Sequence, residues 1–83
     1  MEDMTKLENH VLYWRPTCPF CMRVVDYLNE HGIECAMRNV LEDAAAYDDL
    51  VAVGGKRQIP CLVIEGEALY ESSDIIQYCS QRI

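Results

Sequence analysis

Two cysteines separated by two residues are the part of this sequence best suited to chemistry. Cys18 and Cys21 enclose Pro19 and Phe20, and at this spacing the two sulfurs can close a small disulfide ring. A thiolate at the first cysteine can attack a substrate disulfide, and the second cysteine or an outside thiol such as glutathione then releases the product. The pair predicts a thiol–disulfide oxidoreductase with Cys18 as the nucleophile and Cys21 as the more buried, resolving thiol.

Two simpler interpretations compete with this one. A Cys-x-x-Cys pair can be half of a zinc site, which needs two further ligands at suitable spacing, and it can also be two buried cysteines without a function. The other candidate ligands are scattered: Cys35, Cys61, Cys79, His10 and His31. We therefore predict no metal site. We expect both histidines at the surface and Cys35 and Cys79 in apolar packing. Cys61 faces the core or lies near the pair.

The elements that position Cys18 are a strand and a helix. Residues 11–14 form a short run of β-favouring side chains ended by the breaker Pro16, and a helical pattern begins at Pro19. Cys18 lies between the two, where unpaired backbone N–H groups and the helix dipole stabilise a thiolate. Arg15, three residues earlier, can add a second favourable charge.

A second strand and helix follow. Residues 33–38 alternate loosely, as a strand would, and Asn39 is the expected cap of the next helix, with Glu42 and Asp43 in its first turn. Gly54-Gly55 ends that helix. Its expected apolar stripe comprises Leu41, Ala44, Ala45, Leu50 and Val51.

The last third of the chain predicts a hairpin and a helix. Residues 59–64 form the strongest strand pattern, Glu65-Gly66 is the expected turn, and residues 67–70 return. A final helix starts near Ser72, with Ile75, Ile76 and Cys79 facing inward. The order is β-α-β-α-β-β-α. It predicts an α/β fold of thioredoxin type, with a mixed four-stranded sheet flanked by helices.

Ile59-Pro60 stands at the head of a predicted strand. A proline there lies either on an edge strand or after a cis peptide bond. A cis-proline loop facing Cys18 would expose the backbone of Ile59 for β-like pairing with a peptide or with glutathione. Lys56 and Arg57 come just before and either bind a carboxylate or belong to a solvated loop.

The segment Glu71-Ser72-Ser73-Asp74 opens the last helix. Ser72 is a suitable N-cap. The N–H groups of Ser72 and Ser73 can also bind the carboxylate of a ligand, as helix N-termini bind anions. The two roles are compatible.

Composition narrows the functional classes. Fourteen acidic and seven basic residues give a net charge of −7, which disfavours nucleic acid and anionic membranes as partners and permits docking to a basic protein surface. The start Met1-Glu2-Asp3-Met4 lacks the basic and apolar character of a secretory signal, and no apolar run approaches the roughly 20 residues of a membrane span. We expect one domain over residues 1–83, monomeric and cytoplasmic, where a disulfide is usually transient.

Three segments together resemble the glutaredoxin family over essentially the whole chain. They are Arg15-Pro16-Thr17-Cys18-Pro19-Phe20-Cys21, Gln58-Ile59-Pro60 and Ser72-Ser73-Asp74-Ile75. The resemblance implies glutathione-dependent reduction of protein disulfides and of glutathione mixed disulfides, with glutathione as reductant and no permanently bound cofactor. The implied partners are glutathione and disulfide-bearing or glutathionylated proteins.

The resemblance also assigns roles to the site residues. Cys18 would be the nucleophile and Cys21 the resolving thiol, with Phe20 as apolar surface beside the sulfur. The glycine carboxylate of glutathione would be held by Arg15, Arg57 or Gln58. Ile59, before Pro60, would pair with its cysteinyl backbone, and its γ-glutamyl end would be received by Glu71, Ser72, Ser73 and Asp74.

One segment departs from ordinary glutaredoxins, which have Gly-Gly where this chain has Tyr70-Glu71. Glu71-Ser72 is similar to the Glu-Ser motif in the N-terminal domain of glutathione transferases and of transferase-like glutaredoxins, which bind the γ-glutamyl group there. The helical second domain of those proteins is not expected here.

Two alternative functions follow from the same resemblance. One is a small redoxin reduced by thioredoxin reductase, for example as electron donor to ribonucleotide reductase. The other is an iron–sulfur carrier in which two chains share a cluster through Cys18 and glutathione. Pro19 argues against the carrier, because Cys-Gly-Phe-Ser sites are the usual carriers in this family.

Overall fold

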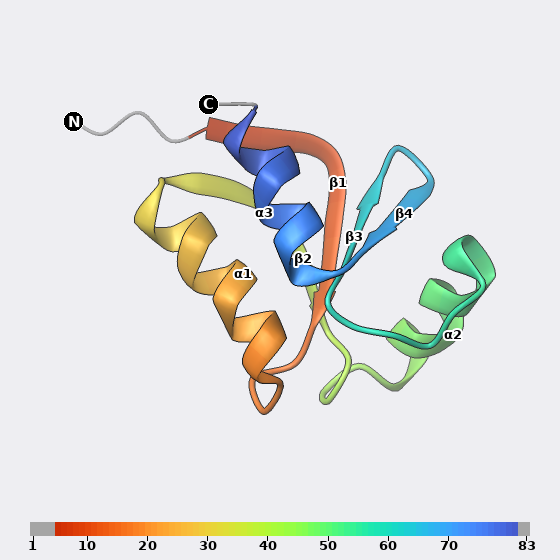
Figure 1. Ribbon diagram of the computed structural model, residues 1–83. Coiled ribbons are helices and arrows are strands. Elements are labelled where there is room, and N and C mark those ends of the chain that lie inside the picture. Colours follow the sequence, from red (N-terminus) through yellow and green to blue (C-terminus); the bar gives the residue numbers. More distant parts are fainter. Residues whose placement is uncertain (1–4, 82–83) are drawn as a thin grey trace.

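The computed structural model describes residues 5–81. The argument against a secretory signal concerns residues 1–4, which lie outside this range. The chain forms four strands and three helices in the expected β-α-β-α-β-β-α order (Figure 1). Their bounds are β1 Thr5–Trp14, α1 Pro19–Glu30, β2 Ile33–Asn39, α2 Ala44–Gly54, β3 Cys61–Ile64, β4 Glu67–Tyr70 and α3 Ser72–Ser80.

The strands form one mixed sheet in the order β2-β1-β3-β4. β1 runs parallel to β2 and antiparallel to β3, and β3 runs antiparallel to β4. The parallel pair is joined through α1, as a crossover connection requires. The predicted thioredoxin-like fold, including the hairpin turn at Glu65-Gly66, is thus confirmed.

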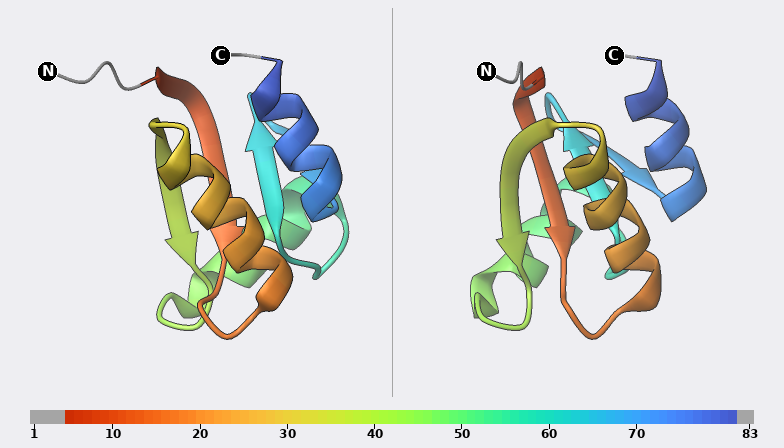
Figure 2. Two further views of the ribbon diagram at one scale, coloured as in Figure 1. Left: turned by 60° about the vertical axis from the view of Figure 1, so that its left-hand side comes forward. Right: turned by 90° about the vertical axis from the view of Figure 1, so that its left-hand side faces the viewer.

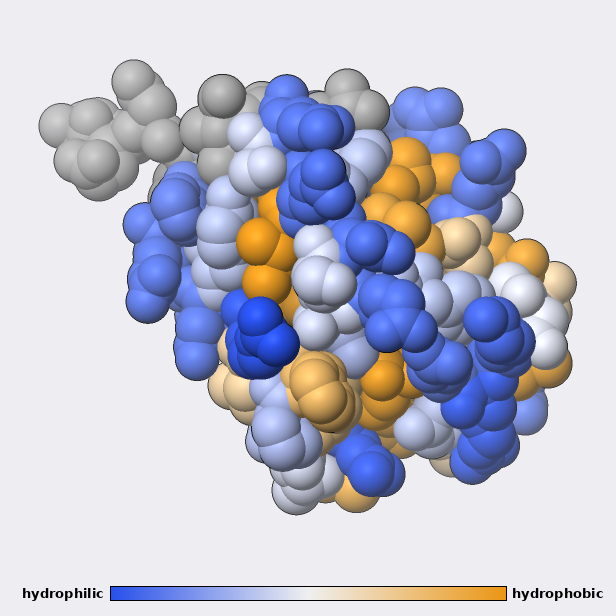
Figure 3. All heavy atoms as spheres, viewed as in Figure 1, coloured by the Kyte–Doolittle hydropathy of each residue, from blue (hydrophilic) through white to orange (hydrophobic). Residues whose placement is uncertain are grey.

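The helices lie on both sides of the sheet, with α1 and α3 on one face and α2 on the other (Figures 1 and 2). Successive residues of a strand point to opposite faces, so Leu12 and Leu62 pack with α1 and α3, whereas Tyr13 and Cys61 pack with α2. The face seen in Figure 3 is mostly hydrophilic, with smaller apolar areas. No helix within residues 5–81 is long and apolar enough to cross a membrane.

The first strand is longer than its apolar run suggested. It begins at Thr5, and its register with β2 is irregular between Lys6 and Val11. Exposed polar residues such as Glu8 and Asn9 give this half of the strand no hydrophobic pattern. Its first two residues, Thr5 and Lys6, pair with β2, and the pairing resumes at Val11.

The predicted start of the second helix was wrong. The Asp43 side chain caps α2 by accepting a hydrogen bond from the Ala45 N–H at 3.1 Å, so neither Glu42 nor Asp43 lies in the first turn. Asn39 instead holds the preceding turn, accepting from the Leu41 N–H at 2.9 Å.

The predicted stripe of this helix was also only partly right. The buried side chains of α2 are Ala46 and Leu50. Four of the expected residues are exposed: Leu41, Ala44, Ala45 and Val51. The error follows from the starting point, since the face that a helical residue presents depends on where the helix begins.

The third strand is shorter than predicted and begins at Cys61. Pro60 has no N–H to donate to the ladder and lies outside it. β3 lies between β1 and β4, so the edge-strand interpretation of Pro60 was wrong. The Ile59-Pro60 peptide bond is cis.

Candidate active site

Cys18 caps the first helix with its own side chain. It has extended backbone angles, Pro19 is the first helical residue, and the Cys18 sulfur accepts a hydrogen bond from the Cys21 N–H at 3.3 Å. The sulfur thus lies at the positive end of the α1 dipole, where it meets one of the N–H groups without a partner inside the helix. This arrangement stabilises negative charge on sulfur, and Cys18 is half-buried rather than enclosed.

Cys21 lies one turn further along α1 and has no exposed surface. Burial, followed by the hydrogen bond to Cys18, raises the pKa of the Cys21 thiol to about 12. Both thiols are free in this structure. The pair is therefore asymmetric in the predicted sense: an accessible sulfur at the helix start and a buried, protonated thiol behind it.

The sheet brings the cis-proline loop to the same end as Cys18. β1 and β3 are antiparallel neighbours with Tyr13 paired to Cys61, so the end of β1 and the start of β3 lie together. Ile59-Pro60 comes directly before β3 and Cys18 follows β1 by four residues. Two loops distant in sequence thus become neighbours.

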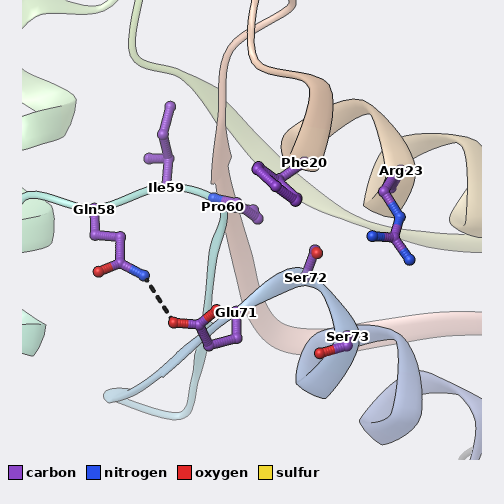
Figure 4. Close-up of a pocket in the computed structure, with 8 residues that line it drawn as sticks. All are labelled: Phe20, Arg23, Gln58, Ile59, Pro60, Glu71, Ser72 and Ser73. Carbon is purple, nitrogen blue, oxygen red and sulfur yellow. Dashed lines mark hydrogen bonds between the residues drawn. The ribbon is translucent and has the colours of Figure 1, made fainter.

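A cavity of about 330 Å³ lies between the first turns of α1, the cis-proline loop and the start of α3, and neither Cys18 nor Cys21 lines it. Figure 4 shows α1, the cis-proline loop and the first turn of α3 around it. Its lining is Phe20, Arg23, Gln58, Ile59, Pro60, Glu71, Ser72 and Ser73. Seven of these eight were predicted as site residues, and they come from three segments that are separate in sequence.

Glu71 and Gln58 meet across one side of this cavity. The Gln58 Nε2 donates a hydrogen bond to Glu71 Oε2 at 3.3 Å (Figure 4). Glu71 has φ of 77°, in a region that residues other than glycine seldom adopt. Such backbone strain is often found at functional positions.

The start of α3 differs from the predicted cap. Glu71 is the N-cap residue and makes no side-chain capping bond, while Ser72 is already the first helical residue. Ser72 is buried and Ser73 is exposed. The prediction that Ser72 caps the helix was therefore wrong. Without a capping side chain, the first-turn N–H groups need another partner, which water or a ligand can supply.

Three predicted binding residues do not line the cavity: Arg15, Arg57 and Asp74. All three are exposed. The Arg57 guanidinium lies over the ring of Tyr47 on α2 at 4.0 Å, and the ammonium of Lys56 lies over the Tyr70 ring at 4.7 Å.

Arg23 also lines the cavity, although it was not among the residues predicted for the site. In Figure 4 its guanidinium extends from α1 on the side of α3. Helical residues three apart share a face, so the spacing from Phe20 to Arg23 was the available signal.

His10 is buried, against the expectation that both histidines are at the surface. Its ring nitrogens bond to the Glu8 carbonyl at 2.7 Å and to the Tyr78 hydroxyl at 2.8 Å, which compensates for lost water. His31 is exposed.

The other cysteines lie apart from the cavity lining. Cys61 and Cys79 are buried, and Cys35 is half-buried. Burial raises the pKa of Cys61 and of Cys35 to about 11 each. Cys61 packs with α2, on the opposite face of the sheet from Cys79. Within residues 5–81, no group of three or more His, Cys, Asp or Glu side chains could hold a metal ion.

Comparison with known proteins agrees with this geometry. A glutaredoxin-like 8.6 kDa protein encoded in the rubredoxin operon of Clostridium pasteurianum is 26% identical over 58 residues, which are 70% of this chain and 77% of that protein. The structure of the thioredoxin-like protein BC3987 superposes with a TM-score of 0.73 at 27% identity, covering 89% of this chain and 99% of BC3987.

A diazinon-metabolizing glutathione S-transferase of the silkworm Bombyx mori superposes with a TM-score of 0.72 at 27% identity. The similarity covers 88% of this chain but only 37% of the transferase. The sequence profile of the glutaredoxin family matches residues 10–69, which include Cys18, Cys21 and the cis-proline. The chain therefore belongs to the glutaredoxin family of thiol–disulfide oxidoreductases.

Proposed function

We propose that this protein is a glutathione-dependent dithiol oxidoreductase that reduces protein disulfides and glutathione mixed disulfides. The observation that supports this most directly is the cavity beside the Cys18 loop. It combines the apolar Phe20, the cis-proline backbone and an uncapped helix start. Glutathione is a short peptide with a central cysteine and a carboxylate at each end. The cis-proline backbone can pair with such a peptide, and the uncapped helix start can bind one of its carboxylates.

The chemistry proceeds through one mixed disulfide. The Cys18 thiolate attacks one sulfur of the substrate disulfide, the S–S bond breaks, and the leaving sulfur takes up a proton. Cys21 then loses its proton and attacks the Cys18 sulfur, which releases the second substrate thiol and closes the Cys18–Cys21 disulfide. Two glutathione molecules restore the dithiol and become glutathione disulfide.

Glutathione mixed disulfides need only the first cysteine. Cys18 takes the glutathionyl group and the substrate leaves as a thiol; a second glutathione then attacks the mixed disulfide and regenerates Cys18. The high pKa of Cys21 suits this route, because a protonated resolving thiol closes the ring slowly enough for glutathione to compete.

The cavity suggests how glutathione would lie. The backbone of Ile59 would pair with the cysteinyl residue, and the glycine carboxylate would be held by Gln58 in the cavity lining or by Arg15 or Arg57 outside it. Glu71, Ser72, Ser73 and Asp74 would receive the γ-glutamyl end. The similarity to a glutathione S-transferase supports this placement. A cytoplasmic location with a reducing glutathione pool fits the role.

A second candidate is a redoxin reduced by thioredoxin reductase. The Gln58 amide already donates a hydrogen bond to the Glu71 carboxylate, and this bond competes with a hydrogen bond from Gln58 to a glutathione carboxylate. The chain carries net −7, and both features weaken the attraction of anionic glutathione. The similarity to a thioredoxin-like protein points the same way.

The deciding experiment follows oxidation of NADPH during reduction of a protein disulfide. One reaction contains glutathione and glutathione reductase, and the other contains thioredoxin reductase. Steady turnover only with glutathione supports the proposal, and turnover only with thioredoxin reductase contradicts it. Cys18→Ser should be inactive with either reductant, and retained turnover would contradict the assigned nucleophile.

A further inference from the structure

Three loops reach the same end of the sheet, in the order of their strands. The turn after β2 contains Leu41, the loop after β1 contains Cys18, and Ile59-Pro60 precedes β3. Because β1 lies between β2 and β3, the Cys18 loop lies between the other two. Figures 1 and 2 show the loops after β1 and β2 at the same end in every view.

The turn after β2, formed by residues 39–42 and called here the Leu41 turn, is held firmly. The Val40 N–H donates to the Trp14 carbonyl at 2.8 Å, which ties the turn to the end of β1. Asn39 accepts from the Leu41 N–H through its side chain, and its carbonyl accepts from the Glu42 N–H at 3.1 Å. The turn has a fixed shape, with Val40 buried and Leu41 outside.

Leu41 and Phe20 are the two most exposed large apolar side chains among residues 5–81, at 60% and 58%. Single exposed apolar residues are ordinary in proteins. These two differ from the rest by position, since Phe20 borders the cavity and Leu41 lies on the opposite side of the Cys18 loop. Phe20 thus borders the cavity from the first turn of α1, and Leu41 lies on the turn after β2, beside the end of β1.

The Leu41 turn takes no part in the cavity, whose lining comes from α1, the cis-proline loop and the start of α3. A ligand as small as glutathione in that cavity leaves Leu41 uncovered. A protein whose disulfide reaches Cys18 covers both sides of the loop, because protein interfaces typically bury about 800 Å² on each partner.

The charge around the Leu41 turn is negative. Between Asn39 and Gly55 the sequence has four acidic residues, Glu42, Asp43, Asp48 and Asp49, and no Lys or Arg. Arg38 pairs with Asp43 and Asp49, and Arg57 lies against Tyr47 of α2. Four carboxylates against the two guanidinium groups of Arg38 and Arg57 leave the Leu41 side of the loop acidic, with Glu42 adjacent to Leu41. Two further cations lie outside this count: Arg15 belongs to the Cys18 loop itself, and Lys56 lies against Tyr70 of β4.

We propose that the Leu41 turn is a docking surface for protein substrates whose disulfide is flanked by an apolar side chain and by Lys or Arg. The inference depends on the proposed function in one respect, that Cys18 reduces protein disulfides. Leu41 contacts the apolar side chain, and Glu42 with the neighbouring acidic residues attracts the basic ones. Glutathione does not use this surface.

The test uses two self-quenched peptide disulfides of equal length, each joining two chains with Leu beside the cysteine. One peptide carries Lys residues around the disulfide and the other carries Glu residues. Reduced protein in excess transfers two electrons and two protons, giving two peptide thiols and the Cys18–Cys21 disulfide. Fluorescence release gives a second-order rate constant without any reductase, and hydroxyethyl disulfide serves as a small neutral comparison.

We expect the wild type to reduce the Lys peptide faster than the Glu peptide, with the difference shrinking at high salt. Leu41→Ser should slow reduction of the Lys peptide about fivefold, the effect of losing a moderate interface contact. Glu42→Lys should reverse the preference between peptides. Val53→Ser, which removes an exposed apolar side chain near the far end of α2, should change nothing.

The outcomes separate the two proposals. Equal rates for Leu41→Ser and wild type on the Lys peptide, or a preference for the Glu peptide, overturn the docking surface. A Leu41→Ser variant that also loses activity on hydroxyethyl disulfide overturns it as well, because the damage then reaches Cys18. If the wild type reduces hydroxyethyl disulfide but neither peptide, the docking surface fails. If it reduces none of the three, the proposed function fails and the inference with it.

Discussion

The backbone N–H of Cys21 donates a hydrogen bond to the sulfur of Cys18 at 3.3 Å, while the Cys21 side chain has no exposed surface. One residue therefore serves the site in two separable ways. In the proposed reaction its main chain stabilises the nucleophile Cys18, and its side chain is the buried thiol that resolves the mixed disulfide. A change of the side chain removes the second contribution and leaves the first.

Cys21→Ser should separate the two reactions of the site. The backbone bond to Cys18 survives, so removal of glutathione from a mixed disulfide should continue at a rate similar to the wild type. Reduction of a protein disulfide should fall about tenfold or more, because no internal thiol resolves the mixed disulfide. Parallel assays of the two substrates measure this, with Cys35→Ser as the control. Equal loss of both activities would show that the Cys21 sulfur is needed before resolution.

Arg23 should matter for anionic ligands because it is the only guanidinium that lines the cavity within the described residues. Arg23→Glu should raise the KM for a glutathione mixed disulfide by about threefold to tenfold at low salt and less at high salt. Lys6→Glu makes the same charge change at an exposed position on β1 and is the matched control. A similar rise in both variants would mean that net charge, not the cavity, determines KM.

The buried Cys61 thiol should make the reduced protein less stable in alkali. Its pKa is about 11 in the folded chain, against about 8.5 for an ordinary cysteine. Between these values the unfolded chain releases a proton that the folded chain retains, so the free energy of unfolding falls as pH rises. Below about pH 8.5 both states hold the proton and no such dependence exists.

Urea unfolding of the reduced protein across this pH range measures the slope. Cys61→Ala should be less stable at neutral pH, because it leaves a cavity, yet should show a shallower alkaline loss. Cys35, whose pKa is also about 11, still contributes in that variant. An unchanged slope would show that Cys61 is not the group that titrates.

Gly54 is required by close packing rather than by backbone angles. A Cβ there would lie 2.8 Å from the Ala68 Cβ and would overlap the Tyr70 hydroxyl, which donates to the Lys56 carbonyl at 3.0 Å. Gly54→Ala should lower the free energy of unfolding by about 1–3 kcal/mol, as overpacking usually does.

A double-mutant cycle tests the cause of this loss. In Tyr70→Phe the hydroxyl that the new Cβ meets is absent, so the added cost of Gly54→Ala should be smaller in that background. Urea unfolding of the four proteins gives the coupling. Additive costs would place the clash at Ala68 instead.

The order of elements was predictable because each strand and helix shows its own hydrophobic period between clear breakers. The local sequence pattern could not predict which strand segments pair with each other. The polar start of β1 pairs with β2 at Thr5 and Lys6. The helix α2 begins at Ala44 because residues 39–42 form a turn and Asp43 is the N-cap.

The site was predictable in its segments but not in its contacts. Cys-x-x-Cys, Ile59-Pro60 and Glu71-Ser72 are visible in sequence, and their meeting follows from the strand order. The bond between Gln58 and Glu71, and the contact of Arg57 with Tyr47, depend on side-chain directions. Long polar side chains such as Gln58 and Arg57 have several partners within reach, so spacing alone does not determine which one they contact.

The position of β1 inside the sheet has a consequence for how this enzyme can diversify. The sulfur emerges from a central strand, and the peptide-sized cavity and the Leu41 turn belong to different neighbouring strands. Under the two proposals above, insertions or substitutions after β2 would alter the choice of oxidised protein without changing the cavity proposed to bind glutathione. The two selectivities would then change one at a time, while the chemistry between them stays the same.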